Sequence, residues 1–554
     1  MHVYEALAEA FIAEDVKDIF ALLGDGNMHW SNSMVNKGAN FTYTRHEHCA
    51  VSMAMAYARA NDTVGVATVT CGPGLTQTMT ALTTAAKARI PIVVFAGESP
   101  ISKDWYNQVL DQEPFVKACG AEYFSIRHPK RIFTTVREVF FKAKNNNQPI
   151  VIGVPLDFQE SKYEGNEKAK PSKLLGWENQ KPEPDSNFIN KAIDLISNSK
   201  KPILLAGLGA IKSDAKKECE EFADKIGALL STTLPARGFF HDHPFSINLA
   251  GGFSSDITRE YFNNADLIIS AGTSLASHAA DAGKLYPNAK VIQIDLDPKP
   301  INQGRVSSHL WIQADVKKAI QKINSEIEKN SKKINTDKDW RDKNKIDQIK
   351  NNLPDAKEFK VKDGYLDPRL VVKELDKVLP KDFFMVNSSG HCSYYPAHML
   401  GRSNENFLTI REFGAIGNGL SYSIGAAVAK KNKQVALIDG DGGFYMHIQE
   451  LETVVRHNIK MLFIILNDEA YGSEIHKLRH DGLSDVGAVF GKSNLENIGQ
   501  GFGLLSKKIN KLEDIKIAFE EFQKSNKSAI WDIPISDNIL SPVMRRLLDS
   551  KKIN

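Results

Sequence analysis

Short apolar runs alternate with segments of helical periodicity along almost the whole chain. Among the first 160 residues, helical periodicity occurs at Tyr4–Glu14, His46–Ala60 and Gly74–Arg89, and strand-like runs occur at Asp18–Leu22, Val64–Val69, Ile92–Ala96 and Val151–Val154. Strands that alternate with helices in this way form parallel sheets covered by helices on both faces. The alternation therefore restricts the chain to α/β folds.

The same alternation recurs twice more. Further strands are expected at Ile203–Ala206, Leu267–Ser270, Val291–Ile294, Phe383–Val386, Gln434–Ile438 and Met461–Leu466, with helices at Gly417–Lys430 and His447–Arg456. Residues 161–185, with three prolines, and residues 321–360, rich in Lys, Asn and Asp, have the composition of linkers, the second with a solvated helix. A chain of 554 residues also exceeds the size of a single core, about 250–300 residues.

We therefore predict three doubly wound parallel-sheet domains, at residues 1–165, 186–335 and 365–545, the central one Rossmann-like. The first and third have a similar size and rhythm, which favours a distant internal duplication.

Composition and charge indicate which kinds of binding partner and which compartment to expect. The formal net charge is only +3, which favours neither nucleic acid nor an anionic membrane. No run approaches the ~18 apolar residues of a membrane-spanning helix, and the N-terminus lacks the pattern of a signal peptide. The five cysteines are scattered and form no CxxC pair, so a reducing compartment, the cytoplasm, is expected.

Two polar segments follow neighbouring apolar strands in the third unit. Gly440-Asp441-Gly442-Gly443 ends one strand, and Asn467 follows the next strand, 26 residues after Asp441. In a parallel sheet both segments lie at the carboxyl edge, where ligands bind. Glycine lets backbone approach phosphate closely, and carboxylate and amide oxygens suit Mg²⁺. The pattern predicts a metal–diphosphate site, although a GDG sequence alone is also typical of a tight turn.

This GDG…N pattern resembles the cofactor motif of the thiamine diphosphate enzyme family, in the group of acetolactate synthase, pyruvate oxidase and benzoylformate decarboxylase. The resemblance covers nearly the whole chain. It implies that thiamine diphosphate is the cofactor and that Asp441, Asn467 and the main-chain carbonyl of Glu469 bind Mg²⁺. Tyr471 and Gly472 complete the motif.

Arg45-His46-Glu47 opens a predicted helix after a strand. In the family, a Glu at this point hydrogen-bonds the aminopyrimidine ring, so that the amino group of the ring can deprotonate the thiazolium carbon. Glu47 matches that catalytic residue. The alternative is an acidic residue favoured by the helix dipole.

Three more segments match family motifs that contact the cofactor. Gly414 and Ile416 correspond to the loop whose bulky apolar residue holds the cofactor bent. Gly72, Pro73 and Gly74 correspond to a GPG turn beside the pyrimidine ring, and His391 to a contact with the diphosphate. Ordinary turns and helix starts are the alternative for each.

Substrate residues are predicted on weaker patterns. The candidates are Asn27, His29, Gln112, His278, Ser473 and His476, and each has an alternative as an ordinary loop or helix residue. The segment after Tyr471-Gly472 differs from that of an acetolactate synthase, so specificity is expected there.

The resemblance implies a homodimer or homotetramer with the active site at the subunit interface. The predicted reaction is decarboxylation of a 2-oxo acid, or attack on a related dicarbonyl, with carboligation of the acetolactate synthase type. The alternative is a decarboxylase without ligation or a carbon–carbon lyase or hydrolase. A flavin or NAD oxidoreductase using the Gly207 loop, or a catalytically silent regulatory subunit, would be a different class. FAD is disfavoured because Leu275–His278 replaces the Arg-containing stretch of FAD-binding relatives.

Overall fold

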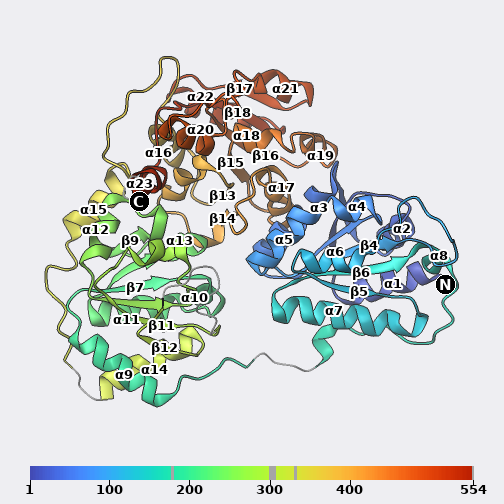
Figure 1. Cartoon of the computed structure of the whole chain (residues 1–554), viewed down its shortest axis with the longest axis horizontal. Helices are drawn as coiled ribbons and strands as arrows, with labels where there is room; N and C mark the ends of the chain where they lie inside the picture. Colours follow the sequence, from blue (N-terminus) through green and yellow to red (C-terminus); the bar gives the residue numbers. More distant parts are fainter. Residues whose placement is uncertain (176–179, 298–306, 330–332, 552–554) are drawn as a thin grey trace.

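The computed structural model describes residues 1–175, 180–297, 307–329 and 333–551. It contains three six-stranded sheets, each entirely parallel and each flanked by helices (Figure 1). Within the described residues no helix is long and apolar enough to cross a membrane. The predicted class, three doubly wound α/β units, is confirmed.

The first unit has the strand order β2-β1-β3-β4-β6-β5. Its strands are β1 Asp18–Ala21, β2 Asn40–Tyr43, β3 Gly65–Val69, β4 Ile92–Glu98, β5 Glu122–Ser125 and β6 Pro149–Pro155. Its helices are α1 Val3–Ala13, α2 Met28–Asn36, α3 Glu47–Asn61, α4 Pro73–Thr76, α5 Met79–Ala88, α6 Gln112–Ala118, α7 Ile132–Asn146 and α8 Leu156–Glu160, with a 3-10 turn η1 Pro129–Arg131. The helix expected over Gly74–Arg89 is thus two helices.

The third unit has the order β14-β13-β15-β16-β18-β17, the same topology as the first. Its strands are β13 Phe384–Asn387, β14 Phe407–Thr409, β15 Val435–Gly440, β16 Met461–Asn467, β17 Leu505–Lys508 and β18 Ala529–Pro534. Its helices are α16 Pro368–Val378, α17 Gly419–Ala429, α18 Asp441–Tyr445, α19 Glu450–Arg456, α20 Gly472–His480, α21 Leu495–Gly501, α22 Asp514–Lys524 and α23 Pro542–Lys551, with 3-10 turns η6 His391–Tyr394, η7 Pro396–His398 and η8 Asn404–Asn406. The shared order supports the duplication that the sequence suggested.

The central unit has the order β9-β8-β7-β10-β11-β12, the 3-2-1-4-5-6 arrangement of dinucleotide-binding folds. Its strands are β7 Pro202–Ala206, β8 Leu229–Thr232, β9 Ser246–Leu249, β10 Leu267–Ala271, β11 Lys290–Ile294 and β12 Leu310–Ile312. Its helices are α9 Ser186–Asn198, α10 Leu208–Lys212, α11 Lys216–Ile226, α12 Asp256–Asn264, α13 Ser277–Ala280, α14 Val316–Lys329 and α15 Lys343–Asn351, with 3-10 turns η3 Leu234–Ala236, η4 Gly251–Phe253 and η5 Asp281–Gly283.

The glycines of the Gly207–Gly209 turn are required by packing. A Cβ atom added to Gly207 would lie 2.4 Å from the carbonyl oxygen of Gly272, and one added to Gly209 would lie 2.6 Å from the Gly272 Cα. Because β7 and β10 are neighbours, the turns that follow them press backbone against backbone. This glycine pattern therefore has a structural explanation that needs no nucleotide.

The two segments predicted as linkers differ. Apart from an isolated bridge between His2 and Lys162, the described residues from 161 to 185 form one short 3-10 turn, η2 Ser172–Leu175. The prediction for 321–360 is wrong for much of its length, because α14 buries Ile323 and Ile327 and the next segment buries Trp340 and Ile346. Isolated apolar residues at helical spacing are enough to pack a charged helix onto a core.

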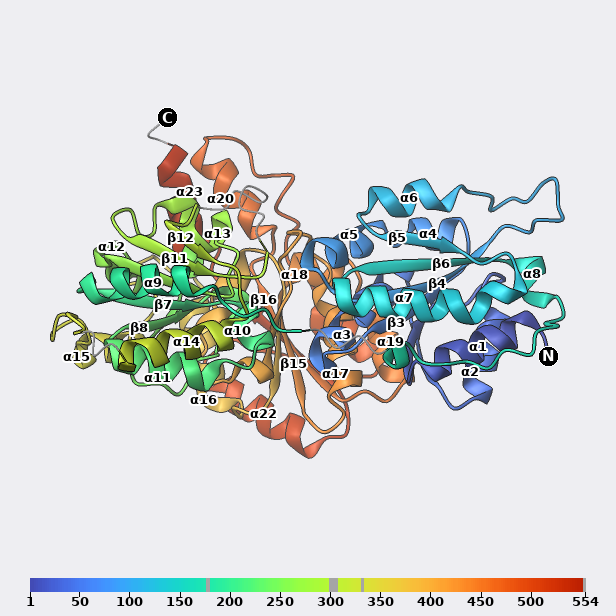
Figure 2. The ribbon, with the colours of Figure 1, turned by 90° about the horizontal axis from the view of Figure 1, so that it is seen from below.

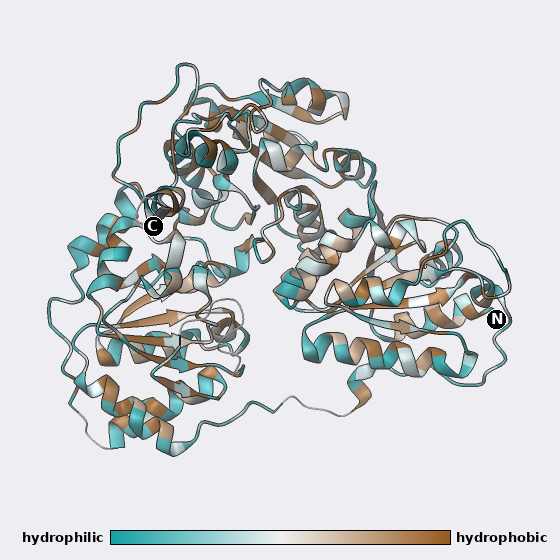
Figure 3. Ribbon diagram, in the orientation of Figure 1, coloured by the Kyte–Doolittle hydropathy of each residue, from teal (hydrophilic) through white to brown (hydrophobic). Residues whose placement is uncertain are grey.

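The strands are mostly apolar and form the interior. The outward sides of the helices are mostly polar and form the surface (Figure 3). One buried cluster joins two units, since Val51 and Ala54 of α3 share it with Leu420 and Ile424 of α17. The two helices lie side by side in both ribbon views (Figures 1 and 2). The first and third sheets are thus held together by one continuous core.

Candidate active site

The GDG and Asn segments meet at the carboxyl edge of the third sheet. Strands β15 and β16 pair in parallel, and Gly440 lies opposite Leu466. Asp441, which follows β15, and Asn467, the last residue of β16, therefore lie side by side at this edge, as the sequence predicts. The strand order reverses between β13 and β15, next to the strand that ends before Asp441. Ligands of open α/β sheets bind at such a reversal.

Asp441 is a buried carboxylate with unused oxygens. Its residue is 1% exposed at the start of α18, and neither carboxylate oxygen has a hydrogen-bond partner. Burial, and then the charge of Asp468, raises the pKa of Asp441. A buried acceptor without a partner is costly unless another group compensates it, and a cation does so.

Asn467 is oriented by its amide nitrogen. Its Nδ2 donates to Asp532 Oδ1 at 2.8 Å and to Ser493 Oγ at 3.0 Å. The Oδ1 atom therefore points the other way, where it accepts the N–H of Glu469 at 3.1 Å and keeps a second lone pair. Asp441 and Asn467 together present hard oxygen ligands at one edge.

Glu469 occupies a strained turn. Its φ of 60° lies in the left-handed region, which is unfavourable for a residue with a side chain. Its carbonyl accepts the N–H groups of Phe490 at 3.1 Å and Gly491 at 3.3 Å, and its carboxylate accepts the Tyr365 hydroxyl at 2.9 Å. The predicted metal-ligating carbonyl is thus engaged by the 490–491 segment in this structure.

Tyr471 and Gly472 pack against the glycine-rich segment. A Cβ atom added to Gly442 would lie 2.8 Å from the Tyr471 ring, which also packs edge-on against Phe490. A Cβ atom added to Gly472 would lie 2.3 Å from Asp468 Oδ2 and 3.4 Å from His391 Nδ1. Both glycines are therefore needed so that the two segments can approach each other.

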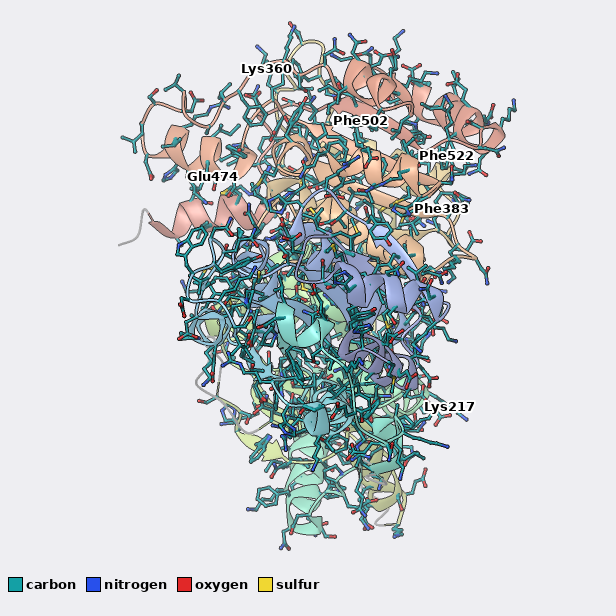
Figure 4. All side chains as sticks on the ribbon, turned by 90° about the vertical axis from the view of Figure 1, so that its right-hand side faces the viewer. Lys217, Lys360, Phe383, Glu474, Phe502 and Phe522 are labelled. Carbon is teal, nitrogen blue, oxygen red and sulfur yellow. The ribbon has the colours of Figure 1, made fainter. Side chains whose placement is uncertain are left out.

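Two histidines border this edge. The ring centroids of His391 and His476 are 4.6 Å apart, and His391 Nε2 accepts the Ser541 N–H at 2.9 Å. Burial lowers the pKa of both, that of His476 to about 4, so both are neutral at pH 7. His476 Nε2 is buried without a partner. His476 and the half-buried Ser473 lie on the inner part of α20, whereas Glu474 is exposed (Figure 4).

Glu47 begins α3 where the first unit meets the third. The adjoining Arg45 N–H donates to Glu450 Oε1 at 3.0 Å, and His48 Nε2 lies 2.6 Å from Asn418 Oδ1. Asn418 is two residues beyond Ile416. The resemblance implies that Glu47 and the GDG motif meet across a subunit boundary. Within one chain, the residues that flank Glu47 contact Glu450 and Asn418 of the third unit.

The GPG turn lies beside Glu47. Glu47 is half-buried, and its Oε1 is 3.7 Å from a Cβ atom added to Gly74. Gly72 has φ 55°, and its N–H donates to Gln112 Oε1 at 3.0 Å. The Gln112 Nε2 donates to the Gly97 carbonyl and to the Tyr123 hydroxyl, both at 3.0 Å. Gln112 therefore holds the turn in place.

Ile416 and Gly414 form an accessible loop before α17. Gly414 has φ 74°, is exposed and has no atom within 4 Å of an added Cβ. The Cγ2 atom of the half-buried Ile416 is 3.9 Å from a Cβ atom added to Gly390, which precedes His391. The loop thus borders the same edge as Asp441.

Three other substrate candidates lie in the first and central units. Asn27 is fully buried and uses its side chain within its own turn, on Leu22, Gly24 and Thr68. His29 stacks on Tyr4 and lies 3.6 Å from Glu160, and His278 is exposed on α13 of the central unit. The contacts of Asn27 and His29 are thus made within the first unit.

Sequence patterns missed several polar residues of the site. Asp468 beside Asp441, the fully buried Glu450 and the stacked rings of His48 and His447 were not singled out. The available signal was the placement of charged or polar residues directly after an apolar strand or a motif.

Comparisons with known proteins agree with this geometry. Models of the thiamine pyrophosphate enzyme family match three stretches: the N-terminal TPP binding domain over residues 1–116, the central domain over 189–323 and the C-terminal TPP binding domain over 388–533. Together they cover more than half of the chain.

The similar proteins found include acetolactate synthases. A probable acetolactate synthase large subunit of Methanococcus aeolicus is 28% identical over 97% of this chain and 92% of its own length. The corresponding protein of Methanocaldococcus jannaschii is 28% identical over 96% and 91%. The chloroplastic acetolactate synthase 2 of Nicotiana tabacum is 28% identical over 84% of this chain and 71% of its own. The chain belongs to the thiamine pyrophosphate enzyme family.

Proposed function

We propose that this protein uses thiamine diphosphate and Mg²⁺ to decarboxylate a 2-oxo acid and to join the remaining acyl carbon to a second carbonyl, as an acetolactate synthase does. The observation that carries the proposal is the pair of unpartnered Asp441 oxygens beside Asn467 at the sheet edge. The family match and the similarity to acetolactate synthase large subunits along nearly the whole chain support the same reaction class.

The residues present fit the cofactor. Asp441 and Asn467 would hold Mg²⁺, which takes one or two protein oxygens and completes its shell with phosphate and water. The glycine-rich segment that includes Gly442 offers backbone N–H groups to the diphosphate. Glu47 and the GPG turn would flank the pyrimidine ring. When bound, thiamine diphosphate supplies a nucleophilic carbon and an electron sink for the bond that breaks.

The protein itself contributes proton control and orientation. The Glu47 carboxyl would hold a proton at a nitrogen of the pyrimidine ring, and this would set the tautomer in which the amino group of the ring acts as base. Ile416 would support the bent shape of the bound cofactor. Neutral His476 has a buried Nε2 without a partner, and this atom would donate or accept a hydrogen bond at the substrate carboxylate or carbonyl.

The decisive experiment is a product screen with the full-length protein. It is incubated with thiamine diphosphate, Mg²⁺ and a panel of 2-oxo acids, and carbon dioxide, aldehyde and hydroxyketone are measured separately. A hydroxyketone product supports carboligation, and an aldehyde alone favours the non-ligating decarboxylase. Absence of all three with every substrate contradicts the proposal.

Glu47→Gln tests the proton assignment. The amide cannot supply the acidic proton, so kcat should fall at least about 100-fold, the lower range for a lost general acid or base. Melting should change little because Glu47 is only half-buried. Unchanged turnover would exclude Glu47 as the switch.

We further propose a homodimer, alone or paired into a tetramer, in which a second subunit covers exposed apolar residues. In the first unit Trp105 is 77% exposed beside Ile101 and Val109, and in the third unit Val486 is 79% exposed near Phe490. Contiguous exposed apolar residues mark interaction surfaces. Sedimentation analysis would refute the proposal if the protein were monomeric at micromolar concentration.

The cytoplasm is the proposed compartment. All five cysteines are buried and free, as expected under reducing conditions. Localisation of a tagged full-length protein tests this, and the chloroplastic names of the plant relatives make organelles the alternative.

A further inference from the structure

Arg411 is a cation at the carboxyl edge of the third sheet and belongs to none of the cofactor motifs. It lies just beyond the carboxyl end of β14, which pairs with β13, and the loop after β13 carries His391. The Nη1 atom of Arg411 donates to the Gly390 carbonyl at 3.2 Å and to the Ser393 hydroxyl. Arg411 is therefore fixed beside His391, whose ring centroid is 4.6 Å from that of His476.

The guanidinium group of Arg411 has no carboxylate partner within the described parts of the chain. The adjacent Glu412 is already used, since its Oε1 accepts from Arg59 at 2.8 Å and its Oε2 accepts the main-chain N–H of Arg411 at 2.9 Å. By contrast, the fully buried Arg402 of the same unit is paired with Asp376 at 3.1 Å. A cation away from bulk water is costly without a counter-charge, and an anionic ligand would supply one.

One edge of the Arg411 guanidinium group is open to a ligand. Its Nε and Nη2 atoms have no hydrogen-bond partner among the residues that the structure describes. Both nitrogens are accessible, since Arg411 is half-buried and neither atom is sealed from solvent. The ring of Phe253 from the central unit covers one face, with its centroid 4.9 Å from the Arg411 Cζ atom. This stacking fixes the plane of the group, and Nε and Nη2 can then bind a carboxylate through two parallel hydrogen bonds.

From this arrangement we infer that Arg411 binds an acid group that the substrate keeps after carbon dioxide has left. The inference rests on the proposed function. A fixed cation beside the carboxylate that leaves would stabilise its charge in the ground state more than in the transition state, where this charge moves away, and would slow the reaction. A carboxylate that remains keeps its charge throughout, so an arginine can hold it without this cost. The retained group is either a second acid group on the 2-oxo acid that is cleaved or the carboxylate of a 2-oxo acid that accepts the acyl carbon.

The alternative for Arg411 is a purely structural brace. Arg237 of the central unit serves in that way, because it donates to the main-chain carbonyls of Ala397 and Arg402 and packs on the Phe407 ring at 4.2 Å. Phe407 begins β14, so Arg237 lies at the amino end of the strand and Arg411 lies beyond its carboxyl end. Arg237→Gln is therefore the matched control for loss of a buried, stacked arginine away from the ligand edge.

The experiment compares the wild type with Arg411→Gln and Arg411→Lys on two matched substrate pairs. The full-length protein is used with thiamine diphosphate and Mg²⁺. The first pair, 2-oxopentanedioate and 2-oxopentanoate, differs by a second acid group on the cleaved substrate, and release of carbon dioxide gives kcat/KM. The second pair, 2-oxobutanoate and propanal, differs by the carboxylate of the acceptor, and hydroxyketone formation is measured with pyruvate as the donor.

Arg411→Gln should lower kcat/KM about 10- to 100-fold for the member of one pair that carries the additional acid group, as expected for loss of a charged two-point hydrogen bond. The other member should change by at most about threefold, and the pair that responds identifies the source of the acid group. Arg411→Lys keeps the charge and should recover part of the loss. Arg237→Gln should leave the ratio between the members of each pair at the wild-type value.

Equal losses for both members of both pairs, or no loss in either pair, would overturn the inference and leave the proposed function intact. The same follows if Arg237→Gln changes the ratios as Arg411→Gln does, or if the wild type accepts only the members without the additional acid group.

A binding measurement separates failure of this inference from failure of the proposed function. Pentanedioate has no carbonyl group to react, and it should raise the melting temperature of the wild type in the presence of thiamine diphosphate and Mg²⁺. Arg411→Gln should lose at least about half of this shift, whereas Arg237→Gln should retain it. If the wild type turns over no substrate, the proposed function fails and the melting shift alone decides the inference, which equal shifts in Arg411→Gln and the wild type, or no shift in either, would overturn.

Discussion

The contact between α3 and α17 depends on a glycine at their crossing point. A Cβ atom added to Gly425 would lie 2.1 Å from the Met53 carbonyl oxygen and 2.7 Å from the Met53 carbonyl carbon and Cα, whereas ordinary contact begins at 3.4 Å. The obstacle is the α3 backbone, so no side-chain rotation relieves it. Gly425→Ala should therefore push the two helices apart by more than 1 Å.

The magnitude follows from two opposed terms. Overpacking of a core costs about 1–3 kcal/mol, and a clash with backbone belongs at the upper end. Alanine regains about 1 kcal/mol of helix propensity. The net loss is about 1–2 kcal/mol, which corresponds to a fall in melting temperature of about 2–8 °C for a unit of 150–250 residues.

Gly425→Ala should affect the turnover rate, kcat, more strongly than it affects the free energy of unfolding. Separation of α3 from α17 would move Glu47 away from the Ile416 loop, and misplacement by about 1 Å can cost about 100-fold in rate. Thermal melting and kcat would be compared with Gly501→Ala, a helical glycine with no atom within 4 Å of its added Cβ. The reasoning is refuted if Gly425→Ala melts and turns over like Gly501→Ala.

Two further predictions concern the same interface and the GPG turn. Burial lowers the pKa of His48 to about 4, so between pH 6.5 and 4 the unfolded chain binds a proton that the folded chain does not; stability should fall on acidification by up to about 1.4 kcal/mol per pH unit. His48→Gln should lessen the difference in melting temperature between pH 7.5 and pH 5, and an unchanged difference would contradict this assignment. Gln112→Ala leaves the buried Gly72 N–H without its acceptor and should cost about 1–3 kcal/mol. Urea denaturation measures that loss. A denaturation midpoint equal to that of the wild type would show that the GPG turn is stable without the hydrogen bond to Gln112.

Periodicity predicted most of the fold because it reports burial directly. The buried strands β4 and β16 each begin with an unbroken apolar run, and helices α1 and α3 have clear amphipathic or small-residue patterns. Short edge strands such as β5 and β17 were not predicted, since their half-buried residues lack a pattern. The 321–360 segment was predicted wrongly because a few buried residues, among them Trp340 and Ile346, outweigh its polar composition.

By itself, the sequence determined the α/β class, the three units and the placement of Asp441 and Asn467 on neighbouring strand ends, because spacing along parallel strands translates into position at one edge. Only the tertiary structure decided which polar groups are satisfied. It showed that Asn27 and Gln112 form hydrogen bonds that hold their turns in place. It also brought the α3 helix that begins at Glu47 against α17. These outcomes depend on contacts between residues that are distant in the chain, and the chemical type of a residue does not reveal which partner it will meet.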